Sequence, residues 1–106
     1  MDVNVDSLDV TDNDADGHYE VRVDGHLAVI EYERLADRIT FIHTSVPPEL
    51  EGHGIAGRLA RVALDDARTR HLAVIPRCPY VAAYIKRHPE YLDLVPEGDR
   101  SRVENA

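Results

Sequence analysis

Apolar and polar residues alternate over residues 19–23, which read Tyr-Glu-Val-Arg-Val. Asp24 and Gly25 follow, a pair that favours a tight turn between antiparallel strands. A second apolar run then covers residues 27–32. Because side chains alternate between the two faces of a strand, this pattern around a short turn predicts a β-hairpin.

A third run, over residues 39–46, is rich in β-branched side chains and stops at Pro47 and Pro48. Prolines cannot donate a hydrogen bond to a sheet, so the run predicts a third antiparallel strand that ends there. From Gly54 to Arg70 the apolar residues recur at helical spacing and predict an amphipathic helix. They are Ile55, Leu59, Val62, Ala63 and Ala67.

The remaining elements are shorter. Residues 72–75 form an apolar run that Pro76 ends, and residues 79–87 suit a second helix with Pro79 in its first turn. The predicted order is strand, strand, strand, helix, strand, helix. A strand-helix-strand crossover beside a hairpin predicts an α+β domain with a mixed, mostly antiparallel sheet and two main helices.

Chain length allows one domain, because 106 residues cannot supply a second core. Residues 1–17 are rich in aspartate, lack periodicity and are predicted to be a disordered acidic tail. Residues 97–106 are predicted to be a polar C-terminal tail. The folded domain is therefore expected at residues 18–96.

Charge and composition narrow the classes of partner. The net charge of −8 would repel phosphate backbones, which argues against nucleic-acid binding and favours cationic partners. No apolar run approaches the roughly 20 residues that cross a bilayer, and the acidic start resembles no targeting peptide. We therefore expect no membrane association and a cytoplasmic location. One cysteine and unpatterned histidines predict no metal site.

Residues 43–59 join the third predicted strand to the first predicted helix. The N–H groups of a helix's first turn have no intrahelical partner, and glycines let a ligand approach them, so this junction suits a pyrophosphate. A plain strand-to-helix turn, in which Gly52 and Gly54 adopt unusual dihedral angles, is the alternative.

Three segments keep a defined order and spacing: Tyr19-Glu20-Val21 with Asp24-Gly25, then His43 to Ala56, then Pro76 to Tyr91. In that arrangement residues 18–96 resemble the Gcn5-related N-acetyltransferases, in particular the smallest, single-domain branch. The resemblance implies acetyl-coenzyme A as co-substrate and no metal. It also implies a thioester carbonyl polarised by a main-chain N–H near the end of the third strand.

The resemblance places the pyrophosphate on the backbone of residues 51–57 and the pantetheine beside the strand that ends at Val46. The implied cofactor-binding residues are Thr44, Val46, Glu51, Gly52, His53, Gly54, Ile55, Ala56 and Gly57. The sequence departs from the family pattern at Glu49 and Glu51, where glutamine or basic residues are usual. Either the loop turns both carboxylates away or cofactor affinity falls, with His53 and Arg58 as the nearest cations.

Three side chains are candidates for catalysis. His43, expected on the strand face of Ile39 and Phe41, is the candidate general base, because histidine titrates near pH ~6.5. A structural histidine is the alternative, with Glu31 or Glu33 then acting through a water molecule. Cys78 is expected to line the acceptor pocket, with a buried filler or a reactive thiolate as alternatives.

The resemblance gives Tyr84 the role of protonating the departing thiolate, and aromatic packing against the sheet is its alternative role. The expected function is direct transfer of an acetyl group to a primary amine: a small amine, a lysine or a protein N-terminus. A non-catalytic module that binds coenzyme A and a protein interaction domain are the alternatives. A monomer or weak homodimer is expected.

Overall fold

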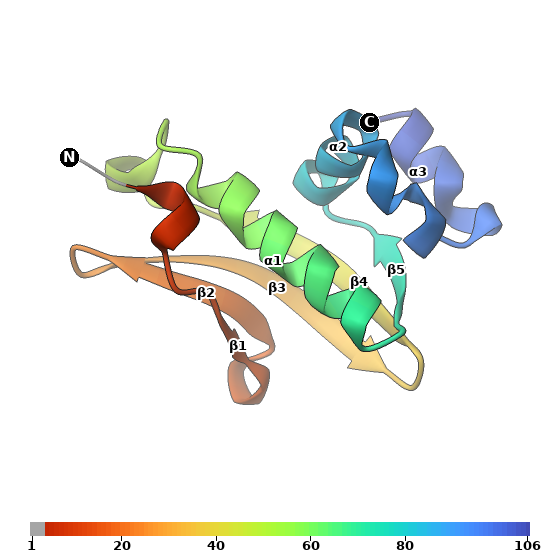
Figure 1. Ribbon diagram of the computed structural model, residues 1–106, viewed down its shortest axis with the longest axis horizontal. Coiled ribbons are helices and arrows are strands. Elements are labelled where there is room, and N and C mark those ends of the chain that lie inside the picture. Colours follow the sequence, from red (N-terminus) through yellow and green to blue (C-terminus); the bar gives the residue numbers. More distant parts are fainter. Residues whose placement is uncertain (1–3) are drawn as a thin grey trace.

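The computed structural model describes residues 4–106, and residues 1–3 of the predicted acidic tail lie outside them. A five-stranded sheet forms the centre, in the order β1-β2-β3-β4-β5 (Figure 1). The strands are β1 (Thr11–Asn13), β2 (His18–Val23), β3 (His26–Leu35), β4 (Arg38–Ser45) and β5 (Ala73–Pro76). The pairs from β1 to β4 are antiparallel, whereas β4 and β5 are parallel. The predicted mixed α+β architecture is confirmed.

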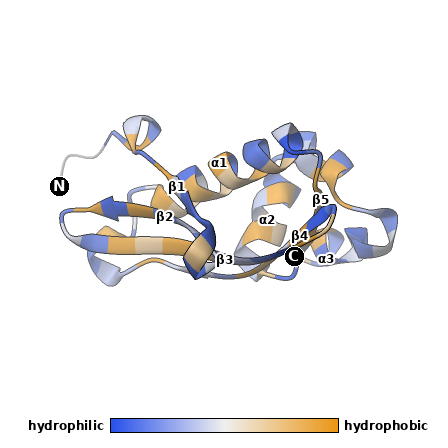
Figure 2. Ribbon diagram, turned by 90° about the horizontal axis from the view of Figure 1, so that it is seen from below, coloured by the Kyte–Doolittle hydropathy of each residue, from blue (hydrophilic) through white to orange (hydrophobic). Residues whose placement is uncertain are grey.

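Helices cover one face of this sheet, as Figure 2 shows. The α-helices are α1 (Ile55–Thr69), α2 (Pro79–Arg87) and α3 (Arg100–Glu104). Short 3-10 turns lie at Val5–Ser7, Asp14–Asp16, Pro48–Leu50, Pro89–Leu94 and Glu97–Asp99. One hydrophobic core lies between the helices and the sheet, and the opposite sheet face carries mostly polar side chains. The fold is therefore a two-layer sandwich.

The core follows from the two periodicities of the sequence. Over part of β2 and β3, and on β4 as far as Phe41, every second residue is buried, as in Tyr19 and Val21 or Ile39 and Phe41. On α1 the buried residues recur every three or four positions. They are Ile55, Leu59, Ala60, Ala63, Leu64 and Ala67.

A β-bulge interrupts the pairing of β3 with β4. Glu31 lies opposite His43, but Tyr32 lies opposite Phe41, so Ile42 is an extra residue on β4. Ile42 is 43% exposed. After the bulge, the next β4 side chain on the core face is that of Thr44, which lies opposite the buried Ile30. His43 lies on the other face. The bulge therefore reverses which β4 side chains face the core.

Strands β4 and β5 pair only along Arg38–Phe41. The last bond between these segments runs from the Cys78 N–H to the Phe41 carbonyl oxygen, at 2.8 Å, after which the chain turns into α2. Within residues 4–106, the part of β4 beyond Phe41 has no strand partner on the β5 side. The two strands thus diverge beside the bulge.

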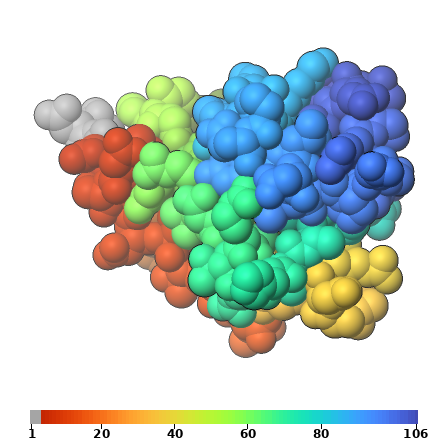
Figure 3. Space-filling view, turned by 45° about the vertical axis from the view of Figure 1, so that its right-hand side comes forward, coloured from red at the N-terminus to blue at the C-terminus, as the bar shows by residue number. Residues whose placement is uncertain are grey.

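The predicted disordered N-terminal tail is wrong for residues 4–17. Strand β1 pairs with β2, and the Asp12 carboxylate accepts a hydrogen bond from the Tyr32 hydroxyl and pairs with Arg34 at 2.8 Å. Val5, Leu8 and Val10 pack against the core. Figure 3 shows this segment, in red, against the start of α1, in green. Specific partners for its carboxylates order a segment whose composition suggests disorder.

The predicted polar C-terminal tail is also structured. Val103 of α3 is only 4% exposed, and the Arg100 Nε–H donates to the Val95 carbonyl oxygen at 3.0 Å. The Lys86 ammonium of α2 donates to the Glu104 carbonyl oxygen at 3.1 Å. A single buried valine in this segment is too little to leave a periodic apolar pattern in the sequence.

Three tyrosines connect the core to aspartates. The hydroxyls of Tyr19 and Tyr91 donate to Asp66 and Asp65 of α1, and that of Tyr32 donates to Asp12. Burial, then the neighbouring carboxylate, raises the pKa of each tyrosine above its ordinary value. A group whose pKa is higher in the folded state stabilises the fold below its unfolded pKa, near pH ~10, and loses that contribution at higher pH.

We therefore expect the free energy of unfolding to fall as the pH rises above about 10, where the unfolded phenols ionise. Urea titrations followed by circular dichroism, at pH values from about 8 to about 11 that span the pKa of an unfolded phenol, measure this free energy of unfolding. Tyr91→Phe removes one ionising phenol and keeps its ring, so its stability should fall less steeply with pH. Equal slopes for the two proteins would contradict the assignment for Tyr91.

Candidate functional site

The segment between β4 and α1 is shaped by one buried side chain and two glycines. Leu50, at the end of a 3-10 turn, is fully buried and holds the loop against the core. Gly52 and Gly54 have φ angles of +82° and +76°, which L residues adopt only with strain. Gly54 is also the N-cap of α1. The glycines therefore let the chain enter α1 directly from the end of the sheet.

The first turn of α1 has backbone N–H groups without intrahelical partners. Within residues 4–106 no side chain caps this turn, and the first α-helical bond runs from the Arg58 N–H to the Gly54 carbonyl oxygen, at 3.1 Å. The amides of Ile55, Ala56 and Gly57 precede that bond. Such amides, together with the positive end of the helix dipole, favour an anionic group.

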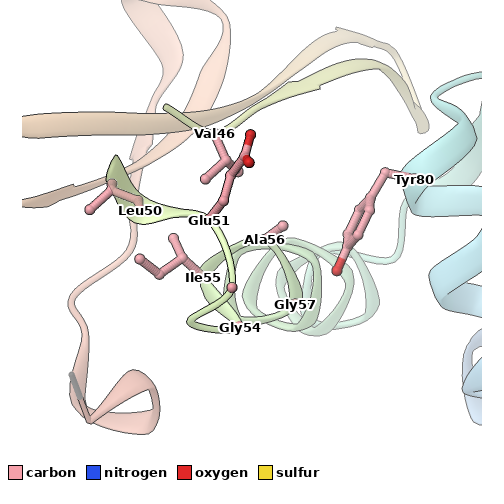
Figure 4. Close-up of a pocket in the computed structure, with 9 residues that line it drawn as sticks. Val46, Leu50, Glu51, Gly54, Ile55, Ala56, Gly57 and Tyr80 are labelled. Carbon is pink, nitrogen blue, oxygen red and sulfur yellow. The ribbon is translucent and has the colours of Figure 1, made fainter. Parts of the chain in front are cut away.

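A cavity of about 210 Å³ lies at this junction (Figure 4). It is lined by Val46, Leu50, Glu51, Gly52, Gly54, Ile55, Ala56, Gly57 and Tyr80. Seven of these nine are residues that the sequence proposed for cofactor binding. The other two proposed residues, Thr44 and His53, do not line the cavity. Sequence analysis missed Leu50 and Tyr80.

Both glutamates of the loop are turned away from the free amides. Glu49 lies toward the β2–β3 hairpin, with its Oε2 3.9 Å from His26 Nδ1. Glu51 lines the cavity, but its carboxylate points toward Val46 and away from the first turn of α1, as Figure 4 shows. The repulsion that these two residues suggest in the sequence is therefore reduced by their orientation.

The nearest arginine serves a different contact. The Arg58 guanidinium donates to the Leu8 carbonyl oxygen, with Nε and Nη2 both at 3.3 Å, and so holds the N-terminal segment. No basic side chain is among the lining residues. Among the lining residues, the groups that favour an anion are consequently backbone amides of α1.

Tyr80 closes the cavity from the first turn of α2. Its hydroxyl lies 3.6 Å from the position that a Cβ on Gly57 would occupy, and Figure 4 shows it pointing at α1. Burial raises the pKa of Tyr80 above its ordinary value, against an opposing effect of Arg87. A tyrosine with a raised pKa stays protonated at neutral pH and can donate a proton.

Tyr84, the tyrosine chosen from the sequence, lies one helical turn further on and does not line the cavity. Its ring is buried and stacks on His88, with 4.2 Å between ring centroids. Burial raises its pKa as well. The contacts of Tyr84 are those of a packed aromatic side chain, which was the alternative interpretation.

Comparison with known proteins shows which family the chain is similar to. Residues 18–94 match the family described as GCN5-related N-acetyl-transferase. The chain belongs to this family. Similar relatives are Protein NATD1 of Mus musculus and of Homo sapiens, each 38% identical over 80 residues. These matches cover 71% of this chain, and 73% and 71% of the mouse and human proteins. Protein NATD1 of Danio rerio is 30% identical over 82 residues, 73% of this chain and 74% of its own length.

The sequence predicts that His43 shares a strand face with Phe41. In this Gcn5-related domain the two side chains lie on opposite faces. The bulge at Ile42 turns the His43 side chain to the sheet face away from the helices, where it is exposed opposite Glu31. The sequence prediction failed because strict alternation assumes an unbroken strand. An imidazole and a carboxylate are thus neighbours on the outer face, beside the divergence of β4 and β5.

Cys78 and Thr44 meet on the helix side of the same divergence. The Cys78 Sγ lies 3.2 Å from the Thr44 Oγ1, and the thiol is 1% exposed. Neither residue lines the cavity at the start of α1. The contact joins the segment that follows β5 to β4, on the helix side of the divergence between the two strands. Its burial corresponds to the small-filler alternative for Cys78.

Among residues 4–106, no three His, Cys, Asp or Glu side chains are grouped so that they could hold a metal ion. None of the helices in that range is long and apolar enough to span a bilayer.

Proposed function

We propose that this protein is an acetyl-coenzyme A-dependent N-acetyltransferase that acts on a primary amine. The observation that supports it most is the cavity of unpaired α1 amides at the end of β4, in a chain of the Gcn5-related family. In this proposal the diphosphate of coenzyme A binds those amides. The pantetheine follows β4 into the gap beside β5, and the acetyl group lies near the bulge at Ile42.

The reaction in this proposal is direct attack. The amine nitrogen bonds to the thioester carbonyl carbon, the C–S bond breaks, the nitrogen loses a proton and the thiolate gains one. A main-chain N–H of β4 beyond Phe41 stabilises the oxyanion, since this edge of the strand has no β5 partner. His43 takes the amine proton from the outer face, and Tyr80 protonates the thiolate. Cys78 is given no covalent role.

Alignment of the two substrates supplies much of the rate in such a reaction, about 7–11 kcal/mol in favourable cases. A small domain with a preformed loop and an open strand edge suits that task. The roles of Thr44 and Cys78 in the proposal are structural, because their contact fixes the width of the gap.

Ala56→Glu tests the cofactor site by adding a carboxylate beside the α1 amides. We expect affinity for coenzyme A to fall about 30-fold relative to Ala56→Gln, which has the same shape without the charge. That factor corresponds to roughly 2 kcal/mol, the repulsion between unit charges about 8 Å apart at an effective dielectric constant of about 20. Isothermal titration calorimetry measures it, and an acidic residue in a first helical turn should leave the fold intact.

Equal affinities for the two Ala56 variants would contradict binding of the diphosphate at α1. A second candidate function is a module that binds coenzyme A without transferring an acetyl group, which is favoured by the absence of His43 and Cys78 from the lining residues. Release of free thiol from acetyl-coenzyme A with a panel of primary amines distinguishes the two. Binding without any amine-dependent thiol release would favour the module.

A further inference from the structure

A second hollow lies on the sheet face that the helices leave uncovered. Its volume is about 270 Å³. Three adjacent strands and the segment just after them supply six of its lining residues, namely Glu33, Leu35, Arg38, Thr40, Ile75 and Arg77. A seventh, Asp99, comes from the 3-10 turn before α3. The hollow is separate from the cavity at the start of α1, since the two share no residue.

Strand register explains how these side chains meet. Glu33 lies opposite Thr40, and Thr40 lies opposite Ile75, so the three form one row across β3, β4 and β5. Leu35 and Arg38 form the next row. Because alternate residues face one side of a sheet, both rows point away from the helices.

The charged residues of the hollow are of both signs and remain apart. Within residues 4–106, no ion pair shorter than 4.0 Å involves Glu33, Arg38 or Arg77, whereas Asp99 pairs with Arg102 at 3.3 Å. Guanidinium groups bind carboxylates in a bidentate manner, and a glutamate accepts hydrogen bonds from an ammonium group. A small molecule with a carboxylate and an ammonium group would complement this arrangement of charges of both signs.

The hollow also has an apolar part. Leu35 is 60% exposed, compared with 43% for Ile42, the other exposed large apolar residue among the described residues. Ile75 is half-buried in the adjacent row. Exposed apolar surface beside unpaired charges favours a ligand with an apolar group near its charged end. A free amino acid with a branched apolar side chain has a carboxylate, an ammonium group and an apolar group close together.

We propose that this hollow binds a free apolar amino acid and that this amino acid is the acetyl acceptor. Its carboxylate binds Arg38 and Arg77, and its side chain packs on Leu35 and Ile75. Arg77 directly follows Pro76, the last β5 residue paired with β4, so one end of the hollow adjoins the divergence of the strands. The identification as acceptor rests on the proposed function. The ammonium group first loses one proton to water, and the neutral amine then attacks the thioester carbonyl carbon. A C–N bond replaces the C–S bond, the nitrogen loses its second proton to His43, and Tyr80 protonates the departing thiolate.

The first test is titration of the full chain with L-leucine, without coenzyme A, followed by nuclear magnetic resonance. Two matched analogues carry one charge each: 3-methylbutylamine lacks the carboxylate and 4-methylpentanoate lacks the ammonium group. We expect each analogue to bind at least about 10-fold more weakly than leucine, since each loses its charge-assisted hydrogen bonds. The double variant Arg38→Gln, Arg77→Gln should lose leucine affinity by a similar factor. Arg22→Gln, on the same sheet face but outside the hollow, should not.

Leucine binding that is absent, or equal in the double variant and the wild type, would overturn the inference. Calorimetry with coenzyme A on the same samples separates this outcome from failure of the proposed function. Coenzyme A binding without leucine binding contradicts the amino-acid site alone. Leucine binding without coenzyme A binding supports the amino-acid site and contradicts acetyl transfer. N-acetylleucine formed from acetyl-coenzyme A, detected by mass spectrometry, is the result expected when both hold.

Discussion

Replacing Phe41 with alanine is expected to lower the free energy of unfolding by about 3–5 kcal/mol. The Phe41 side chain is fully buried between the sheet and the helices. Removal of a fully buried side chain leaves a cavity. Phe41 is also the last β4 residue paired with β5, and its carbonyl oxygen accepts a hydrogen bond from the Cys78 N–H. A loss of that size is a large fraction of the roughly 5–15 kcal/mol that stabilises a typical domain.

Urea unfolding followed by circular dichroism measures the effect of Phe41→Ala. Phe41→Leu keeps most of the volume and should cost much less. Ile42→Ala is the matched control, since Ile42 is the exposed neighbour in the bulge, and a surface substitution there should change stability by about 0.5 kcal/mol or less. If Phe41→Ala and Ile42→Ala cost the same, Phe41 does not anchor the divergence of β4 and β5.

The strands and the long helix were predictable because each carries one uninterrupted period. The hairpin of β2 and β3 and the stripe of α1 need only local alternation, which neighbouring residues encode. The bulge at Ile42 has no comparable local pattern, since it depends on how β4 pairs with β3. One extra residue therefore reversed the predicted face of His43 and of the β4 residues after it, and left only Arg38–Phe41 on the predicted faces.

The acidic segment shows a limit of composition as a guide to order. A high density of aspartates normally indicates solvated chain, because such a segment buries little apolar surface. Here Asp12 accepts a hydrogen bond from the Tyr32 hydroxyl and pairs with Arg34, and the Leu8 carbonyl oxygen accepts a hydrogen bond from Arg58. All of these partners are distant in the sequence. Partners at that separation are visible only in the folded chain, so the predicted boundary at residue 18 was too late.

The loop at the start of α1 could be predicted because its geometry is local. Glycines before an apolar stripe specify the turn and the free amides whatever lies around them. Choosing between Tyr80 and Tyr84 needs the packing of α2 against α1. The two tyrosines are four residues apart and so lie on one face of α2, one turn from each other. The sequence identifies that face but not which turn reaches the cavity.

Tyr80→Phe is expected to lower the turnover number about 10²–10⁴-fold, the usual contribution of a positioned acid or base. Under the proposed function, the phenylalanine keeps the ring that lines the cavity but cannot protonate the thiolate of coenzyme A. Affinity for coenzyme A should change little, because the α1 amides and not this hydroxyl hold the diphosphate. Thiol release at saturating substrates measures turnover, and calorimetry measures affinity.

Tyr84→Phe is the matched control for that measurement. It makes the same chemical change one turn along α2, at a ring that stacks on His88 and does not line the cavity. Its turnover should remain close to that of the wild type. A large loss for Tyr84→Phe with none for Tyr80→Phe would return the acid role to Tyr84. In that case α2 would have to rotate or shift along α1 when coenzyme A binds, because Tyr84 does not line the cavity.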